Sequence, residues 1–513
     1  MVTGHPGAYE TDHLAQQQRS PTRRISRRLA LAAVGGAVMG AAARSAVRSK
    51  TPLMAPGPIL LCARRADAAE RETLIKPPEI RSANGGLKAT IVAASGQVRL
   101  GDIAFPGYLY NGAYIPPVLR ASLGDRMSIG FRNDLAVQPS NLHFHGMSVS
   151  PRGNSDNVFI HVHPGQQFNY EVDVPSAGRQ GPGFFWYHPH AHGVVAPQIL
   201  GGMSGGLVVD GSERLYPILR GMTETLLLIK HAEIGEEHES TEREIISING
   251  QVNPVVQIRP GEMQFWRIGH IGATLFIKVQ VGGMPLYVVG RDGHPMSRPQ
   301  KVTEFLIGPG ERIDAIVIGP ARGEYAMRTV AFVNEAWKKP DASQLIATVV
   351  SGGSDIPAPS GEAEVLRQHL EGTSWLDEVR AAPIARRRTL EYSRTPDRHA
   401  FMIDGRVMDE NRVDQTVRLG DTEEWTVINT DQQYHSFHIH QTGFLVTEIG
   451  GVRQDEQSLR DTVSIPPGNA AGPGILKVVI PFTDPVILGR FVYHCHAVDH
   501  EDKGMMGIVE VVA

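Results

Sequence analysis

Short apolar runs rich in β-branched residues recur along the chain from about residue 75 to its end. Clear examples are the segments 225–229, 313–318, 424–428 and 476–480. Gly, Pro or Asp flanks most of these runs, as is typical of strands joined by tight turns. Helical periods are scarce, and only the segment 362–370 is expected to form a short helix. The pattern predicts an all-β protein.

A loose repeat predicts three related domains within this β-rich stretch. Gly followed by an acidic residue precedes a strand-like run at 124–126, 261–263 and 420–422, at intervals of roughly 140–160 residues. We expect a first domain over 75–215, a second over 216–355 and a third over 385–513, with a linker over 356–384. The charge cluster beside this linker is interpreted as a solvated basic patch; it consists of Arg386, Arg387 and Arg388.

Composition gives no indication of a nucleic-acid-binding protein and shows that histidine is unusually abundant. The chain of 513 residues has a formal net charge of -4, which gives no indication of a nucleic-acid partner. Its 55 Gly and 35 Pro suit many turns between strands, and its two Cys allow at most one disulfide. Histidine is the unusual residue, because there are 21 and they are unevenly spread.

The first 74 residues are interpreted as an export signal and a linker. Ser-Arg-Arg-Leu-Ala-Leu at 26–31 precedes an apolar stretch that ends near Ala43, and it resembles a twin-arginine signal. The stretch has about 15 residues, which is too short for a stable membrane span. We therefore expect a periplasmic or extracellular protein. Cys62 follows an apolar patch, as the cysteine of a lipid anchor does, but Leu61 fits an anchor poorly, so Cys62 is interpreted as an incidental linker residue.

Four histidine clusters hold the candidate chemistry. Random placement predicts roughly one His-x-His pair, yet the sequence contains six. Alternate residues of a strand face the same side, so such a pair can offer two imidazoles to neighbouring metals. The clusters are His143 and His145; His188 and His190; His435, His438 and His440; and His494, Cys495, His496 and His500 with Met505. The histidines interpreted as surface or structural residues are His161, His163, His192, His231, His270 and His294.

The last cluster points to copper. Strand alternation places His494 and His496 on one face and Cys495 on the other, so the thiolate is expected to serve a different metal from its neighbours. With His500, Met505 and an upstream histidine, Cys495 completes a His₂Cys set with an axial Met, the composition of a blue-copper centre. The alternative is a buried free cysteine, which the flanking histidines disfavour.

The four motifs, in this order, resemble those of the three-domain multicopper oxidases, the laccase and copper-oxidase family, over residues 75–513. The resemblance implies three cupredoxin-like domains, each a Greek-key β-sandwich or barrel, and four copper ions. It implies a type 1 copper on His435, Cys495, His500 and, axially, Met505. It implies a trinuclear cluster between the first and third domains, with the type 2 copper on His143 and His438. The implied type 3 ligands are His145, His188, His190, His440, His494 and His496. The second domain, which has no such cluster, is expected to act as a spacer.

The resemblance implies one-electron oxidation of a small reducing substrate, coupled to four-electron reduction of O₂ to water. Because this reduction consumes protons, carboxylates are expected near the cluster. Glu501, directly after His500, is one candidate, as in similar bacterial laccases. Asp156 stands where the family places an acid near the type 2 water channel. For each of them the alternative role is a salt bridge or a turn cap. The axial Met505 predicts a weakly oxidising type 1 copper.

The electron donor is the open question. A laccase-like enzyme would oxidise phenols or aromatic amines beside His435 and His500, whereas a metallo-oxidase would oxidise Cu(I), Fe(II) or Mn(II) in metal tolerance. Metal oxidases of this family often have a Met-rich insert or acidic residues over the type 1 site. The third domain has only a sparse group of such Met and acidic residues, which mildly favours the laccase. The group consists of Met402, Asp404, Met408 and Asp409. A non-catalytic copper-binding protein is a further alternative, and a copper nitrite reductase matches poorly because it lacks the paired His-x-His set.

Overall fold

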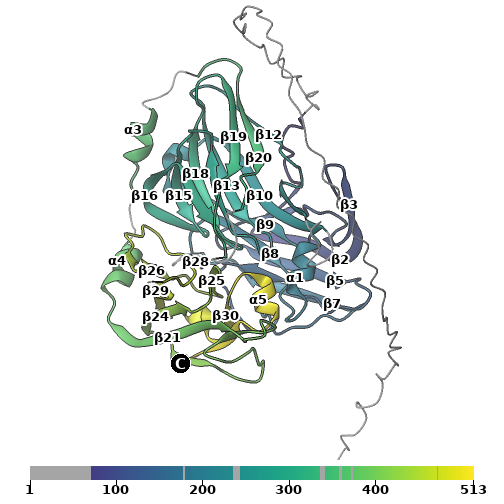
Figure 1. Cartoon of the computed structure of the whole chain (residues 1–513), viewed down its shortest axis with the longest axis vertical. Coiled ribbons are helices and arrows are strands. Elements are labelled where there is room, and N and C mark those ends of the chain that lie inside the picture. Colours follow the sequence, from purple (N-terminus) through teal and green to yellow (C-terminus); the bar gives the residue numbers. More distant parts are fainter. Residues whose placement is uncertain are drawn as a thin grey trace, which may run out of the picture. The chain divides into compact units, whose positions relative to one another are not determined.

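The computed structural model describes residues 71–176, 180–234, 243–335, 341–356, 361–370, 374–470 and 472–513. Within these ranges strands form six sheets, accompanied by a few short helices (Figure 1), so the all-β prediction is confirmed. The four apolar runs predicted as strands all lie within observed strands. The predicted export signal and Cys62 lie outside the described residues.

The first domain has two facing sheets, with strand orders β3-β2-β5-β7 and β1-β4-β9-β8-β6. Alternate residues of β5, such as Ile129 and Phe131, are buried and pack against Leu119 and Phe185 of the other sheet. Its elements are β1 (Glu79–Arg81), β2 (Gly86–Leu100), β3 (Ile103–Tyr110), β4 (Val118–Ser122), β5 (Arg126–Asn133), β6 (His143–His145), β7 (Gln167–Asp173), β8 (Gly183–His188), α1 (Val195–Leu200), β9 (Gly205–Asp210), α2 (Ser212–Leu215) and η1 (Pro217–Leu219).

The middle domain repeats this plan, with strand orders β11-β10-β13-β18-β15-β16 and β12-β20-β19-β14-β17. Trp266 is fully buried in its core. Its strands are β10 (Thr223–Ile234), β11 (Arg243–Ile248), β12 (Val255–Ile258), β13 (Met263–His270), β14 (Ile277–Val281), β15 (Leu286–Arg291), β16 (His294–Val302), β17 (Glu304–Ile307), β18 (Arg312–Ile318), β19 (Gly323–Thr329) and β20 (Leu345–Ser351).

The last domain has strand orders β22-β21-β24-β29-β26-β27 and β23-β31-β30-β25-β28 around the buried Trp425. Its elements are β21 (Ile384–Arg394), β22 (Phe401–Ile403), β23 (Gln415–Arg418), β24 (Thr422–Asn429), β25 (His435–Ile439), β26 (Leu445–Ile449), β27 (Val452–Arg453), β28 (Thr462–Ile465), β29 (Gly474–Pro481), η2 (Pro485–Ile487), β30 (Gly489–His494), α5 (Val498–Asp502) and β31 (Met506–Val512).

Two details differ from the predictions around the segment that joins the middle and last domains. The helix expected over 362–370 ends earlier, as α3 (Gly361–Leu366), and a second helix, α4 (Ser374–Ala381), follows it. Arg386–Arg388 lie on β21; the interpretation as a solvated patch holds for Arg386 and Arg387, which are exposed, but it is wrong for Arg388, which is bound to Glu423 of β24 at 2.6 and 2.8 Å. The opposite charge on the paired strand neutralises Arg388. The domain boundaries stay predictions.

Contacts between the domains hold the sheets of the first and last domains against each other. Phe184 of the first domain, Leu228 of the middle domain and Val498 of the last domain belong to one buried apolar cluster. The Asp502 carboxylate of α5 accepts hydrogen bonds at 2.7–3.1 Å from three backbone N–H groups at the start of α1, and these two helices lie side by side (Figure 1). In the described part of the chain, no helix has both the length and the apolar character to cross a membrane.

Candidate metal centres

Strand pairing brings the four predicted motifs together in two pairs. β6 pairs with β8, so that His143 lies opposite His188. β25 pairs with β30, so that His438 lies opposite His494. Two pairs of antiparallel strands, each formed by segments well separated along the chain, thus each supply part of a set of histidines, and the packing of the first domain against the last domain brings the two parts together.

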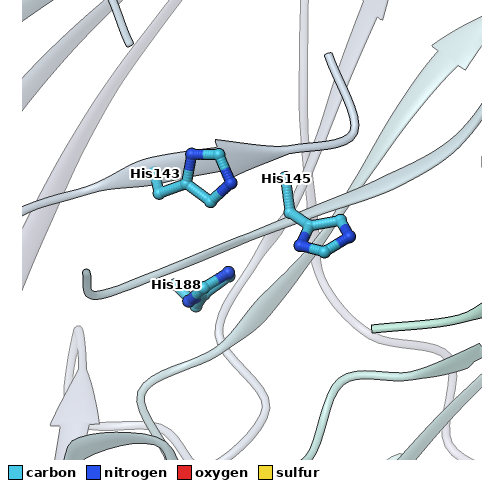
Figure 2. Close-up of side chains that lie close together, drawn as sticks. All are labelled: His143, His145 and His188. Atoms are coloured by element: carbon cyan, nitrogen blue, oxygen red, sulfur yellow. The ribbon is translucent and has the colours of Figure 1, made fainter. Parts of the chain in front are cut away.

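Eight buried histidines form what we call the eight-histidine cluster. Each has at most 2% of its surface exposed. The Nε2 atom of His494 lies 3.2 Å from those of both His190 and His440, and His145 Nδ1 lies 3.1 Å from His496 Nε2. Figure 2 shows three members of the cluster, His143 and His145 from β6 and His188 from the end of β8. The cluster comprises His143, His145, His188, His190, His438, His440, His494 and His496.

The hydrogen bonds of three of these histidines fit metal binding. On the Nδ1 side, His143 contacts Asp156 Oδ1 at 3.0 Å, His188 contacts the Pro189 carbonyl at 2.9 Å, and His438 contacts a backbone carbonyl at 2.8 Å. Their Nε2 atoms are buried without any hydrogen-bond partner. Metal-ligating histidines typically donate one ring N–H in this way and direct the other nitrogen to the metal, so the residues present fit metal ions.

Burial also sets the charge of these side chains. It lowers the pKa of His143, His145, His188, His440 and His496 well below the usual value, and neighbouring imidazoles lower it further. At neutral pH the rings are therefore uncharged, with a lone pair available, which is the state that binds divalent and monovalent transition metals.

A second buried site surrounds Cys495, and we call it the cysteine site. Cys495 Sγ lies 3.4 Å from His435 Nδ1 and 3.5 Å from His500 Nδ1, and the two Nδ1 atoms are 3.1 Å apart. Burial raises the pKa of the Cys495 thiol, so a thiolate here requires a metal to stabilise it. Met505 is fully buried beside this site, and its carbonyl accepts a hydrogen bond from the Cys495 backbone N–H.

The two predicted carboxylates both lie against the eight-histidine cluster. Asp156 contacts His143 and accepts hydrogen bonds from the backbone N–H of Phe144 and from Gln441 Nε2, both at 2.9 Å. Burial raises the pKa of Asp156 to about 7. Glu501 lies 3.1 Å from His494 Nδ1 and 3.6 Å from His190 Nε2. Burial would raise the pKa of Glu501 as well, but the nearby His494 and His190 outweigh it and hold that pKa at about 2, so Glu501 is ionised at neutral pH whereas Asp156 is partly protonated.

Two histidines of the described ranges that were interpreted as surface or structural residues have partners outside both sites. His161 pairs with Glu410 at 3.3 Å, and His231 contacts Thr274 at 2.9 Å. Sequence reasoning missed Asp461, which contacts His145 Nε2 at 3.1 Å. No local motif marks Asp461, because its partners come from distant parts of the chain.

Comparisons with known proteins agree with this geometry. Three family models, each described as multicopper oxidase, match residues 94–214, 223–351 and 382–513. The multicopper oxidase mco of Staphylococcus haemolyticus is 25% identical over 448 residues, covering 83% of this chain and 89% of its own length. A laccase of Bacillus stratosphericus is 22% identical and covers 79% of this chain and 90% of its own length. The structure of a multicopper oxidase from Campylobacter jejuni, described as a metallo-oxidase, has a TM-score of 0.72 at 21% identity, covering 86% of this chain and 95% of its own.

The chain belongs to the multicopper oxidase family, and its domains have the cupredoxin fold. It is a copper-dependent oxidoreductase that uses O₂ as acceptor and a reducing substrate as donor. The predicted family, fold and enzyme class are thereby confirmed.

Proposed function

We propose that this chain is a laccase-type oxidase that couples one-electron oxidation of a small reducing substrate to four-electron reduction of O₂ to water. One observation supports this above all: a complete eight-histidine cluster and a complete cysteine site are joined by the three consecutive residues His494, Cys495 and His496. A non-catalytic copper-binding protein would not need both sites intact and connected in this way.

Four copper ions would be held as follows. His435, Cys495, His500 and Met505 would hold a type 1 copper, and His143 and His438 a type 2 copper. The type 3 pair would be held by His145, His188, His190, His440, His494 and His496. When bound, these ions supply one-electron acceptance at the cysteine site and multi-electron reduction of O₂ at the eight-histidine cluster.

The protein's own residues provide the connection and the protons. Because Cys495 is covalently continuous with His494 and His496, it gives the shortest through-bond route between the two sites. Asp156 and Glu501 are buried against different histidines of the eight-histidine cluster. We propose that Asp156 delivers protons to the cluster as a general acid and that Glu501, which is ionised, accepts protons and passes them on to the cluster.

The substrate is proposed to be a phenol or an aromatic amine. The acidic and Met residues that would suggest a metal substrate have structural roles: the Asp404 carboxylate accepts a hydrogen bond from the Glu391 backbone N–H, Asp409 accepts one from the Asn411 backbone N–H, and Met408 packs beside a buried apolar cluster. This supports the laccase-like interpretation over one based on a methionine-rich metal site.

A metallo-oxidase is the second candidate, and one observation favours it. Asp431 Oδ2 lies 3.5 Å from His435 Nε2, and Asp499 Oδ1 lies 3.8 Å from His500 Nε2. Carboxylates next to both histidines of the cysteine site would suit a cationic donor such as Cu(I), Fe(II) or Mn(II). Asp431 is paired with Arg394 at 3.0 Å, however, which reduces its attraction for a cation.

The decisive experiment is to load the purified protein with copper and measure copper content, visible absorbance and EPR. O₂ uptake is then compared with a phenol, Cu(I), Fe(II) and Mn(II) as donors. We expect four coppers per chain, a blue band and the fastest uptake with the phenol. The His161→Ala variant is a matched control, because His161 lies outside both sites. A protein without a blue band and without O₂ uptake would refute the proposal.

We also propose that the chain is exported in its folded state by the twin-arginine-like segment at 26–31. Replacing Arg27 and Arg28 by Lys is expected to retain the protein inside the cell. Fractionation of cells that express the two forms tests this, and equal export of both forms would contradict it.

A further inference from the structure

A buried ion pair joins the middle domain to the eight-histidine cluster. Arg312, at the start of β18, donates from Nη1 to Asp461 Oδ1 at 2.8 Å and from Nη2 to Asp461 Oδ2 at 2.6 Å. Arg312 also donates to the carbonyls of Phe184 at 3.1 Å and Gly310 at 2.8 Å. Both charged side chains are at most 2% exposed. The middle domain supplies no histidine to the eight-histidine cluster. Its Arg312 nevertheless binds Asp461, which contacts the cluster directly.

Asp461 in turn contacts histidines from two domains. Its Oδ1 atom lies 3.1 Å from Nε2 of His145, in the first domain. Its backbone carbonyl lies 2.8 Å from Nδ1 of His438, in the last domain. A carboxylate at Nε2 keeps the proton of His145 on that nitrogen, so Nδ1 is left with a free lone pair directed toward His496 Nε2, 3.1 Å away.

Two glycines leave room for this ion pair and for the histidine that it supports. Gly146, directly after His145, has φ +85°, and a Cβ there would collide with Arg312 Nη2 and Asp461 Oδ2. Gly310 has φ +88°, and a Cβ there would lie 3.1 Å from His145 Cε1. Backbone of the first domain therefore lies close against the ion pair, and backbone of the middle domain lies close against His145.

We propose that Arg312 is a positioning residue for the trinuclear copper cluster. By holding the Asp461 carboxylate in a two-point ion pair, it fixes the ring orientation and the protonated nitrogen of His145. The middle domain thus acts as more than a spacer, because it completes a site to which it gives no ligand. This inference rests on the proposed function, since it assumes that the eight-histidine cluster binds copper.

The test is the copper affinity of Arg312→Met and Arg312→Lys, measured by chelator competition and by EPR of the bound copper. Loss of a group that supports a metal ligand typically weakens metal binding by about 10- to 100-fold. We expect a loss of this size for copper at the eight-histidine cluster in Arg312→Met, with the blue absorbance of the cysteine site preserved. Arg312→Lys keeps the charge but not the two-point geometry, so it should recover part of the affinity.

Arg267→Met is the matched control. Arg267 is also buried in the middle domain and bound to a carboxylate, Asp314, at 2.7 Å, but no contact joins it to the cluster. It should lose stability and keep the copper affinity and EPR of the wild type. If Arg312→Met does not fold, Asp461→Asn takes its place, because it removes the ion pair and retains an oxygen for His145.

The outcomes separate the two proposals. Wild-type protein that binds fewer than four coppers would refute the proposed function. Wild-type protein with four coppers, together with Arg312 and Asp461 variants of unchanged affinity and EPR, would refute the role of Arg312 alone. Equal loss of copper from Arg267→Met would also refute it, because the effect would then follow from general destabilisation.

Discussion

Replacing Glu224 by Gln is expected to weaken the junction between the first and middle domains at neutral pH and much less in acid. Glu224, on β10, accepts a hydrogen bond at 2.5 Å from Arg120 of β4 and another at 3.1 Å from Arg267 of β13. The first arginine belongs to the first domain and the second to the middle domain. Removing the carboxylate charge leaves both guanidinium groups with one fewer partner.

The magnitude follows from the pKa of Glu224. Burial alone would raise it, but the attraction of Arg267 and Arg120 outweighs burial and holds it at about 2, against an ordinary value of 4.5. The difference corresponds to ~3.4 kcal/mol at ~1.4 kcal/mol per unit. The side chain is 26% exposed, so screening reduces this to about 2–3 kcal/mol. Because folding lowers this pKa, the stabilisation is complete above pH ~4.5 and is lost as the pH falls toward ~2.

Thermal unfolding of wild type and Glu224→Gln at pH 7, 5 and 3.5 measures this. At ~2–4 °C per kcal/mol for domains of this size, the transition that includes the first two domains should fall by about 5–10 °C at pH 7. At pH 3.5 the difference should shrink to roughly half of that. Glu424→Gln is the control, because its partner Arg387 is 71% exposed and the pair should contribute less than ~1 kcal/mol. An equal shift at pH 7 and pH 3.5 would refute the reasoning.

Three further predictions concern the metal sites. Cys495→Ser should abolish the blue absorbance while copper analysis still finds about three ions, and an intact blue band would contradict the assignment of the cysteine site. Glu501→Gln should keep its copper but slow O₂ uptake by about 100-fold, whereas near-normal turnover across the pH range would exclude Glu501 as a main proton donor. Gly146→Ala should cost at least ~1–2 kcal/mol, because its φ of +85° suits only glycine. It should also reduce copper binding by displacing Arg312; calorimetry and copper analysis that match wild type would count against both effects.

Local sequence patterns were sufficient to predict the fold class and to divide the candidate ligands between two sites. Alternation along a strand separated Cys495 from His494 and His496, and the structure places the thiol beside His435 and the two imidazoles in the eight-histidine cluster. The apolar runs predicted β-structure because they are short, rich in β-branched residues and mostly flanked by Gly, Pro or Asp. The assignment of each ligand to a particular copper stays a prediction.

Charge patterns were less reliable, because their meaning depends on the strand that lies opposite. Arg388 looked like part of a solvated patch, but β24 places Glu423 against it. The residues around Asp156 and Glu501 in the sequence do not indicate that either carboxylate is buried. Their positions against the cluster were proposed from family resemblance and not from the residues around them.

The sequence by itself thus predicted which residues would bind metal and which neighbouring side chains face opposite ways, since both depend on spacing within a few residues. Only the tertiary structure decided how the sites are supported. His145 and His496 are separated by 351 positions, and Arg312 and Asp461 by 149. Contacts over such distances arise from the packing of whole domains, in which the middle domain brings a buried arginine to a cluster built by the other two.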